Sequence, residues 1–259
     1  MSASAGTDRP EVALEAGTLV IGDLHLDLDR EDLARAFAAW LDGLGEVPRL
    51  VVLGDFFEYW IGPAQAESPG GRIVLEALGR RHARGTAVDV VPGNRDFLLD
   101  RRFELETGAR LHPSGFVAPL PGGQRALVIH GDELCTLDAG YQRLRRVLRS
   151  RPVRWASAQM PLWLGRRLAR RLRRASREAL ETKPRAEAEQ QPDAVRALTE
   201  AAGAALLVCG HAHEFRDERL PGGPRWLVVD AFGGARDCLR ATDEGDFVAG
   251  SSTDLGRRA

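Results

Sequence analysis

The fold of this chain is decided by the stretch Leu206-Leu207-Val208-Cys209-Gly210-His211-Ala212-His213. A short run of apolar residues, typical of a buried strand, stops at a glycine, and two histidines follow with one residue between them. In an extended or turning backbone this spacing lets both imidazoles reach one small volume. The stretch therefore predicts a buried strand that delivers two histidines to a site beyond its carboxyl end.

The same arrangement recurs at Val20–His25, Val51–Asp55, Val88–Asp96 and Leu127–Asp132. In each case an apolar strand is followed by a glycine that lies next to Asp, Asn or His. Glycine lets the backbone turn sharply and approach a bound group closely, and ligands of α/β proteins gather beyond the carboxyl ends of strands. We therefore expect one site at one edge of a sheet, built from Asp23, His25, Asp55, Asn94, His130, His211 and His213.

This set of donor side chains indicates a metal centre. Seven donors are too many for one tetrahedral zinc ion, but they suit two divalent cations about 3.5–4 Å apart that share a carboxylate. Oxygen and imidazole donors without thiolate favour harder ions, so we expect manganese, with iron or zinc as alternatives. A single strand-end histidine or Gly-Asp pair is more often structural, but turn chemistry alone hardly produces five such motifs.

Composition limits the class of protein. The 259 residues, 44% of them hydrophobic, suffice for one large α/β core or for a core with a subdomain. A net charge of −1 gives no indication of a polyanionic partner, and three widely spaced cysteines are typical of a reduced, cytosolic chain. The first 16 residues lack the apolar run of a secretory signal, and no stretch reaches the ~20 apolar residues of a membrane span.

Changes of character along the chain predict its organisation. We expect a disordered tail at 1–16, an α/β core at 17–137 and 191–245, a basic amphipathic helical lid at 138–190, and a second tail at 246–259. Strands at 18–21 and 50–53, separated by a helix, predict a right-handed parallel unit. Asp29 or Asp32 is expected to cap that helix. The aromatic loop Gly54–Gly62 fits core packing and the wall of a substrate cleft equally well.

The lid segment, residues 138–190, is unusually basic. Between Ala139 and Arg177 there are 13 arginines and no Asp or Glu, so the rest of the chain is strongly acidic. Leucines recur at helical spacing, and this pattern suits a membrane surface or an anionic amphiphile. A solvated arginine face over a packed subdomain is the plain structural alternative. Arginine also pairs bidentately with phosphate, which leaves nucleic acid as a further alternative, although we expect no nucleic-acid partner.

Together the motifs resemble those of the calcineurin-like metallophosphoesterase superfamily. They are Asp-Leu-His at 23–25, Gly-Asp at 54–55, Gly-Asn-Arg-Asp at 93–96, His-Gly-Asp at 130–132 and Gly-His-Ala-His at 210–213. A closer resemblance, to the UDP-2,3-diacylglucosamine diphosphatase family of lipid A biosynthesis, rests on residues 54–62, 93–99 and 130–142 and on the helical insertion. Arg95 supports it, since most superfamily members have histidine there. The resemblance implies an α/β fold in four αββα layers, a β-sandwich flanked by helices, with a helical lid.

The resemblance also implies roles for individual residues. One cation would bind Asp23, His25, Asp55 and His213, and the other would bind Asp55, Asn94, His130 and His211, so that Asp55 bridges. Substrate contacts would come from Asn94, Arg95, Asp138, Ser176, Lys183 and His211. Ala212 stands where the family usually has Thr, and Leu180 where it commonly has an Asn that contacts substrate. These departures leave the metal site intact but make the preference for head group or acyl chain less secure.

The expected activity is that of a metal-dependent hydrolase acting on UDP-2,3-diacylglucosamine. Water activated by two cations would attack the α-phosphorus and give UMP and 2,3-diacylglucosamine 1-phosphate. Arg95 would offset charge on the phosphoryl oxygens, and Asp96 would orient a ligating imidazole. The lid would cover the acyl chains and hold a peripheral membrane protein at the cytoplasmic face of a bacterial inner membrane. The alternatives are a soluble phosphodiesterase or nucleotide pyrophosphatase, and a non-catalytic lipid-binding scaffold.

Overall fold

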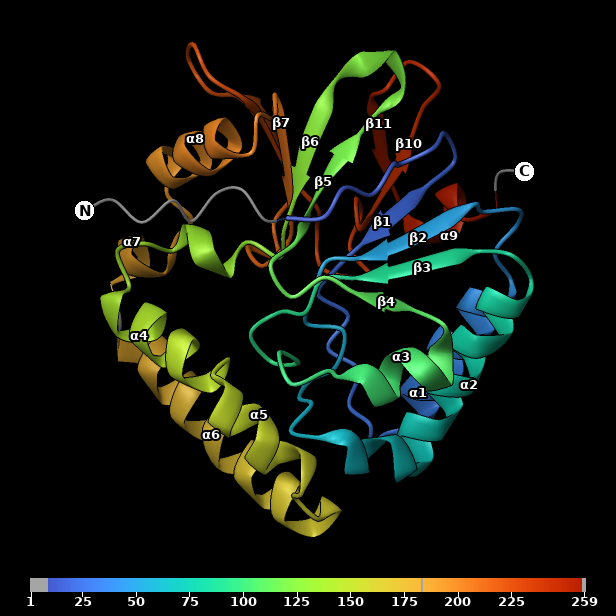
Figure 1. Cartoon of the computed structure of the whole chain (residues 1–259), viewed down its shortest axis with the longest axis vertical. Coiled ribbons are helices and arrows are strands. Elements are labelled where there is room, and N and C mark those ends of the chain that lie inside the picture. Colours follow the sequence, from blue (N-terminus) through green and yellow to red (C-terminus); the bar gives the residue numbers. More distant parts are fainter. Residues whose placement is uncertain (1–8, 183, 258–259) are drawn as a thin grey trace.

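Two β-sheets lie face to face in the centre of the computed structural model, with helices on both outer sides (Figure 1). The structure describes the backbone of residues 9–182 and 184–257, and their side chains except at 173, 175–182 and 185. The first sheet consists, in spatial order, of β11 (Phe247–Gly250), β10 (Cys238–Ala241), β1 (Leu19–Ile21), β2 (Arg49–Val52), β3 (Ala87–Val90) and β4 (Arg110–Leu111). The second consists of β5 (Phe116–Pro119), β6 (Arg125–Val128), β7 (Leu206–Cys209), β9 (Arg225–Val228) and β8 (Arg216–Arg219).

The strands that carry the glycine motifs are parallel to their motif-bearing neighbours. In the first sheet β1 pairs with β2 and β2 with β3, with Leu50 opposite both Leu19 and Val88. In the second sheet β6 pairs with β7, with Leu127 opposite Leu207. The predicted parallel pairing is therefore present. The motifs are divided between two sheets, however, so the expectation of a single sheet edge is wrong.

Four layers follow from the alternation of side chains along the strands. In β1, Leu19 and Ile21 pack with the helices α1 (Glu31–Asp42), α2 (Pro69–Ala83) and α3 (Arg101–Thr107), whereas Val20 packs between the sheets. In the second sheet, Leu127 packs with α8 (Pro192–Ala201), whereas Val128 packs between the sheets. The order helix, sheet, sheet, helix confirms the predicted αββα class.

The helices begin at residues that the sequence identifies only in part. Ser68 caps α2 by accepting a hydrogen bond from the Gly71 amide at 3.1 Å. In contrast, α1 begins after Arg30 without a side-chain cap, so the prediction of a cap by Asp29 or Asp32 is wrong. Asp32 lies inside the first turn, where its carboxylate accepts a hydrogen bond from Arg30 Nε at 2.9 Å.

Both predicted tails are wrong over the part of the chain that the structure describes. Val12 donates its amide hydrogen bond to Val117 O at 3.0 Å, and Leu14 is buried between the sheets. At the other end, β11 pairs antiparallel with β10, and the short helix α9 (Ser252–Leu255) buries Leu255 in the core. Each segment is short and mostly polar, but a few apolar residues with the right spacing are enough to dock it.

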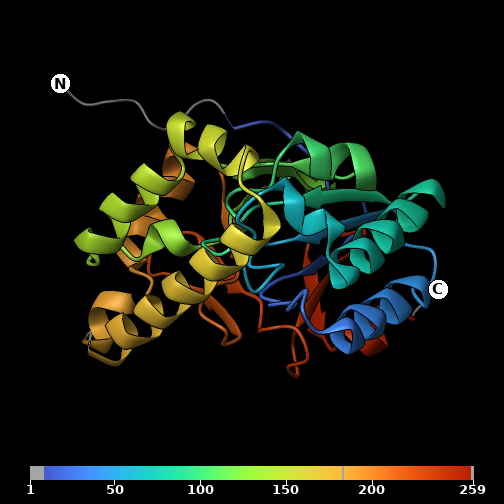
Figure 2. The ribbon, with the colours of Figure 1, turned by 90° about the horizontal axis from the view of Figure 1, so that it is seen from below.

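The described residues of the segment 138–190 form four helices that lie to one side of the sandwich, away from α1 and α2 (Figures 1 and 2). They are α4 (Ala139–Leu148), α5 (Arg151–Ala158), α6 (Leu162–Thr182) and α7 (Arg185–Ala188). They contact the loop that follows β2, where Tyr59 and Ile61 cluster with Ala169 and Met160. Across the described ranges, no helix has the length and apolar character needed to traverse a bilayer.

The aromatic loop after β2 confirms the prediction of core packing and also contacts the lid segment, whereas its role as the wall of a substrate cleft stays a prediction. Phe56, Phe57 and Trp60 are fully buried in the core, with the two phenyl rings stacked at a centroid distance of 4.6 Å. Tyr59 and Ile61 instead face the lid segment. Core packing therefore accounts for three of the aromatic residues, and the fourth helps to dock the lid.

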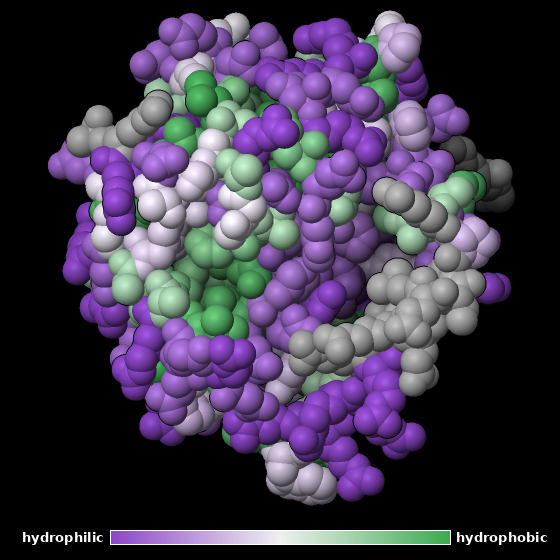
Figure 3. Space-filling model, turned by 180° about the vertical axis from the view of Figure 1, so that it is seen from behind, coloured by the Kyte–Doolittle hydropathy of each residue, from purple (hydrophilic) through white to green (hydrophobic). Residues whose placement is uncertain are grey.

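The surface is unevenly apolar. The face opposite to that of Figure 1 is mainly hydrophilic, with a compact apolar area left of centre and smaller apolar areas near the top (Figure 3). In the lid segment, single large apolar side chains stand exposed among arginines. Trp155 is 72% exposed and Trp163 67%, and Leu144 and Val147 are also exposed. The two lid tryptophans are therefore mainly in contact with solvent.

Candidate metal centre

The backbone is strained at five of the seven predicted ligands. Among the described residues, a positive φ in a residue other than glycine occurs at Asp23, His25, Asp55, His211 and His213, at values from 46° to 71°. Such a conformation costs on the order of 1–3 kcal/mol at each position and persists only where surrounding structure enforces it. The fold therefore concentrates its backbone strain in the loops that aim these side chains.

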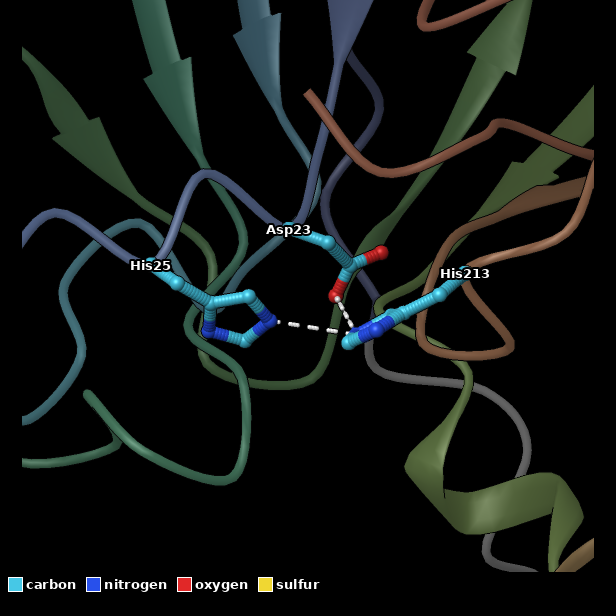
Figure 4. A group of neighbouring side chains, drawn as sticks. All are labelled: Asp23, His25 and His213. Carbon is cyan, nitrogen blue, oxygen red and sulfur yellow. Dashed lines mark hydrogen bonds and ion pairs between the residues drawn. The ribbon is translucent and has the colours of Figure 1, made fainter. Parts of the chain in front are cut away.

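The first group of donors joins loops from the two sheets. Asp23 and His25 follow β1, and His213 follows β7. His25 Nε2 lies 3.1 Å from His213 Nε2, and His213 Nε2 lies 3.4 Å from Asp23 Oδ1. The two imidazoles point at each other beside the carboxylate (Figure 4). Their ligand atoms lie within 4.8 Å of one another, close enough to hold one metal ion.

The second group lies beside the first. His130 Nε2 is 3.1 Å from Asn94 Oδ1 and 3.8 Å from Asp55 Oδ1. The ring of His211 lies against that of His130 at a centroid distance of 5.0 Å. The other carboxylate oxygen of Asp55 is 3.9 Å from His25 Nδ1. Asp55 therefore stands between the two groups, and the structure brings all seven predicted ligands together.

Glycines allow the loops to approach this closely. A side chain on Gly93 would place its Cβ 2.3 Å from Asp55 Oδ1, and one on Gly210 would place it 2.5 Å from Asp23 Oδ2. On Gly54, whose φ is +80°, a Cβ would lie 2.6 Å from His130 Nδ1. No side chain fits in these gaps, so the glycines after β2, β3 and β7 are required by the packing of the ligands themselves.

The buried donor atoms lack partners that a cation would supply. Among the described residues, Asp23 Oδ1 and His25 Nδ1 are buried without a hydrogen-bond partner, and such atoms are costly in a protein interior. Burial, with the nearby Arg95 charge, lowers the pKa of His25 to about 3, and burial lowers that of His211 to about 4. Both imidazoles are therefore neutral near pH 7, the form that binds metals. These residues fit divalent cations.

Two further groups, the Asp55 carboxyl and the His130 imidazole, have pKa values raised above their ordinary ones, so protons compete with a metal at both. Burial raises the pKa of Asp55 to about 7. Burial alone would lower the pKa of His130, but the Asp55 and Asp23 carboxylates raise it. His130 Nδ1 lies 2.6 Å from Leu53 O, which assigns the proton to Nδ1 and leaves Nε2 facing the site. Sequence inspection missed this role of the Leu53 carbonyl, because any residue at that position offers one.

Asp96 does not orient an imidazole, so that prediction is wrong. Its Oδ2 accepts hydrogen bonds from the Phe56 amide at 2.7 Å and the Phe57 amide at 3.4 Å, and its Oδ1 accepts one from the Gly93 amide at 2.6 Å. Asp96 therefore ties the ligand loop after β2 to the ligand loop after β3. The prediction failed because a carboxylate next to a ligand motif can bind the backbone amides of the loops as well as the ring N–H of a ligating histidine, and the sequence does not distinguish the two.

Arg95 lies at the edge of the cluster. Its Nε is 3.3 Å from Asp55 Oδ2, and its Nη1 is 2.8 Å from Glu58 Oε1. Glu58 Oε2 is in turn 3.8 Å from His25 Nδ1. Sequence inspection missed Glu58, and its only signal was its place directly after the Gly-Asp motif among aromatic residues. Glu58 links the arginine to a predicted metal ligand.

The predicted substrate contacts are placed only in part. Asn94, Arg95 and His211 lie at the cluster. The Asp138 carboxylate caps α4 by accepting a hydrogen bond from the Tyr141 amide at 2.8 Å. Lys183 and the side chains of Ser176 and Leu180 lie outside the described residues. Ala212 lies in the turn between the two histidines, where its amide donates to Gly210 O at 2.9 Å.

Comparison with known proteins gives consistent matches. A family model described as calcineurin-like phosphoesterase matches residues 17–215. The UDP-2,3-diacylglucosamine hydrolase of Ralstonia nicotianae is 39% identical over 88% of both chains. The protein of that name from Pseudomonas putida is 40% identical over 75% of this chain and 81% of its own. A solved structure of phosphopantetheinyl hydrolase from Mycobacterium tuberculosis covers 84% of this chain and 90% of its own, at 18% identity and a TM-score of 0.42, too low to support an argument.

Replacing Gly93 by alanine should damage metal binding. The new Cβ would meet Asp55 Oδ1 at 2.3 Å and the Asp55 amide nitrogen at 2.4 Å, so the carboxylate between the two donor groups must move. We expect at least about tenfold weaker Mn²⁺ binding by calorimetry. Gly45→Ala is the matched control, because its Cβ would come no closer than 3.6 Å to another atom. Undiminished affinity in Gly93→Ala would contradict the assigned geometry.

Metal binding should weaken as the pH falls below 7. Burial raises the pKa of Asp55 to about 7, so its carboxyl must lose a proton before it can bind a cation. We expect Mn²⁺ affinity to fall at least about tenfold for each pH unit below 7, with the His130 proton adding to the effect of the Asp55 proton. Calorimetry at about pH 6 and about pH 7.5, in buffers of different ionisation enthalpy, measures both the affinity and the protons released. Equal affinity at the two pH values would show that Asp55 is not a ligand.

Proposed function

The chain belongs to the calcineurin-like phosphoesterase family, and we propose that it hydrolyses the pyrophosphate bond of UDP-2,3-diacylglucosamine. Water attacks the phosphorus that carries uridine, and the bond from that phosphorus to the oxygen of the sugar phosphate breaks. The products are UMP and 2,3-diacylglucosamine 1-phosphate, the chemistry of a lipid A pathway hydrolase. The observation that carries the proposal is the cluster of seven donor side chains together with the neighbouring lid segment, which is basic and has exposed apolar side chains.

The donor set supports two divalent cations. Asp23, His25, Asp55 and His213 would hold one, and Asp55, Asn94, His130 and His211 the other. When bound, the cations supply positive charge that lowers the pKa of water and stabilises charge on the phosphoryl oxygens. Oxygen and imidazole donors without thiolate favour Mn²⁺, with iron or zinc as alternatives.

Arg95 is suited to bind the phosphoryl oxygens. Its guanidinium is held from one side by Asp55 and Glu58, which fixes its orientation before substrate arrives. Its side chain remains 33% exposed, so N–H groups are left for an anion. A guanidinium offers a planar pair of donors to phosphate oxygens, and donors held in place beforehand stabilise a transition state best.

The lid segment is suited to the lipid part of the substrate. Its exposed leucines and tryptophans would cover the acyl chains, and its arginines would meet anionic head groups or the pyrophosphate. Substrate contacts by Asp138, Ser176 and Lys183 belong to this proposal as well. Exposed tryptophans beside arginines are also typical of proteins that lie on a membrane surface. We therefore place the protein at the cytoplasmic face of the inner membrane, attached peripherally.

Two other functions are less well supported. A soluble phosphodiesterase or nucleotide pyrophosphatase on the same metal site gives no reason for Trp155 and Trp163 to be exposed. A non-catalytic lipid-binding scaffold gives no reason to keep strained ligand loops. Turnover of the UDP-sugar lipid, compared with turnover of dinucleotides and single-stranded nucleic acid, separates the first alternative. Elemental analysis separates the second, since a scaffold need not contain metal.

Attack at the uridine-bearing phosphorus should place solvent oxygen in UMP. When UDP-2,3-diacylglucosamine is incubated with the enzyme and Mn²⁺ in water enriched in heavy oxygen, mass spectrometry should find the label in UMP and none in the sugar phosphate. Asp55→Ala, which removes the carboxylate between the two donor groups, should abolish turnover. Label in the sugar phosphate would overturn the assigned point of attack.

Removing the two exposed tryptophans should weaken membrane binding. For the double variant Trp155→Ala/Trp163→Ala we expect about tenfold weaker binding to vesicles containing phosphatidylglycerol, measured by co-sedimentation. Leu105→Ala is the matched control, because Leu105 is 74% exposed but lies in α3, outside the lid. If the double variant binds vesicles as well as the control does, the lid tryptophans are not the membrane contact.

A further inference from the structure

One arginine of the lid segment reaches a ligand loop of the core. Arg149 is the C-cap residue of α4, directly after Leu148. Its Nη2 donates to Gly93 O at 3.2 Å and to Pro92 O at 3.5 Å. Its Nη1 donates to Pro113 O at 3.1 Å, so both ends of the guanidinium are held. The Gly93 carbonyl belongs to the peptide that leads into Asn94, whose side chain faces His130. Arg149 therefore bonds directly to the peptide that carries a proposed metal ligand.

The position of Arg149 is fixed by a buried carboxylate. Asp132 Oδ2 accepts hydrogen bonds from Tyr141 Oη at 2.6 Å, Arg145 Nε at 2.7 Å and Arg149 Nη2 at 3.4 Å. All three donors come from α4 or its end, and Asp132 itself follows His130 by two residues. The Asp132 carboxylate is 2% exposed, so these bonds lie in a poorly solvated place where they are strong. The end of α4 is thus held against the ligand loops after β3 and β6.

On the core side of this contact, the backbone around Gly93 is restrained by further hydrogen bonds. The Gly93 amide donates to Asp96 Oδ1 at 2.6 Å, and the next amide but one, that of Arg95, donates to Asp55 Oδ1 at 3.0 Å. The Pro92–Gly93 peptide is therefore held by Asp96, the Asn94–Arg95 peptide by Asp55, and the Gly93–Asn94 peptide between them by Arg149 of the lid segment. Of these three contacts, only the one from Arg149 comes from outside the phosphoesterase core.

We propose that Arg149 is a positioning residue, which couples the docking of the lid to the metal centre by holding the Gly93–Asn94 peptide. When α4 is seated, the guanidinium sets the direction of the Asn94 side chain toward the cation. When α4 shifts, the Gly93–Asn94 peptide loses the hydrogen bond from Arg149, only its two neighbouring peptides stay held, and Asn94 binds less well. The proposal rests on the proposed di-metal function, but its test measures metal binding without the lipid substrate.

The decisive experiment is Mn²⁺ titration of the full chain by calorimetry and electron paramagnetic resonance, comparing Arg149→Ala with two other lid variants. Arg145→Ala removes ion pairs from α4 to Asp132 and Glu133 but leaves the contact to Gly93. Arg146→Ala removes an exposed charge from the same helix, and its described hydrogen bond lies within α4. We expect about tenfold weaker binding of one Mn²⁺ equivalent in Arg149→Ala, a clearly smaller loss in Arg145→Ala and none in Arg146→Ala.

The outcomes separate positioning from general lid docking. Arg149→Lys should recover part of the affinity, because an ammonium can bind one carbonyl but cannot span Gly93 and Pro113, and it serves as the test variant if Arg149→Ala does not fold. Equal weakening in Arg145→Ala would show that lid docking as such is responsible and would overturn the proposal. Unchanged Mn²⁺ affinity in both Arg149 variants would overturn it as well. Failure of lipid turnover in the unsubstituted protein would count against the proposed function, not against this contact.

Discussion

The structure depends on the close approach of acidic and imidazole side chains at the carboxyl ends of two stacked sheets. Asp23 lies in one group with His25 and His213 and in a second with Asp55 and His130, and the ligand atoms within each group are at most 4.8 Å apart. The backbone is strained at four of these five residues. In the cluster by itself, buried atoms of Asp23 and His25 have no hydrogen-bond partner, and burial raises the pKa of Asp55 to about 7. Such an arrangement is unfavourable in isolation. The packed sandwich supplies the stability that keeps the cluster in place. A bound cation would offset the negative charge of the carboxylates and give the buried atoms a partner.

The rigidity comes from the way the two sheets share the ligand loops. The loop after β1 donates backbone hydrogen bonds to the loop after β2: the Asp23 amide donates to Gly54 O at 3.1 Å and the His25 amide to Asp55 O at 2.8 Å. Across the sandwich, the His211 amide donates to Asp23 Oδ2 at 2.7 Å. Each donor side chain is thus aimed by a neighbouring loop as well as by its own strand. A shift of one loop would disturb several ligands together.

Much of the fold and of the site could be predicted from the sequence, for a definite reason. Gly-Asp and Gly-His pairs after apolar strands mark both the strand and the point where the chain turns, so the seven donors could be named. What could not be predicted depends on contacts between segments far apart in the chain. Asp96 binds amides after β2, and Leu53 offers only a carbonyl, which every residue has. Val12 and Leu14 dock a mostly polar segment that local pattern assigns to a tail.

The return of the chain from the lid to the core has a consequence for how separable the two parts are. Gln190 is buried there, and its Nε2 donates to Gly210 O at 2.9 Å and to Gly131 O at 3.3 Å. These carbonyls belong to the loops that carry His211 and His130. The lid segment is therefore not structurally independent of the core, because its last residues support the loops that carry two proposed metal ligands. Any lid exchanged for it, by recombination or by design, must also bring an amide that fits beneath both histidine loops.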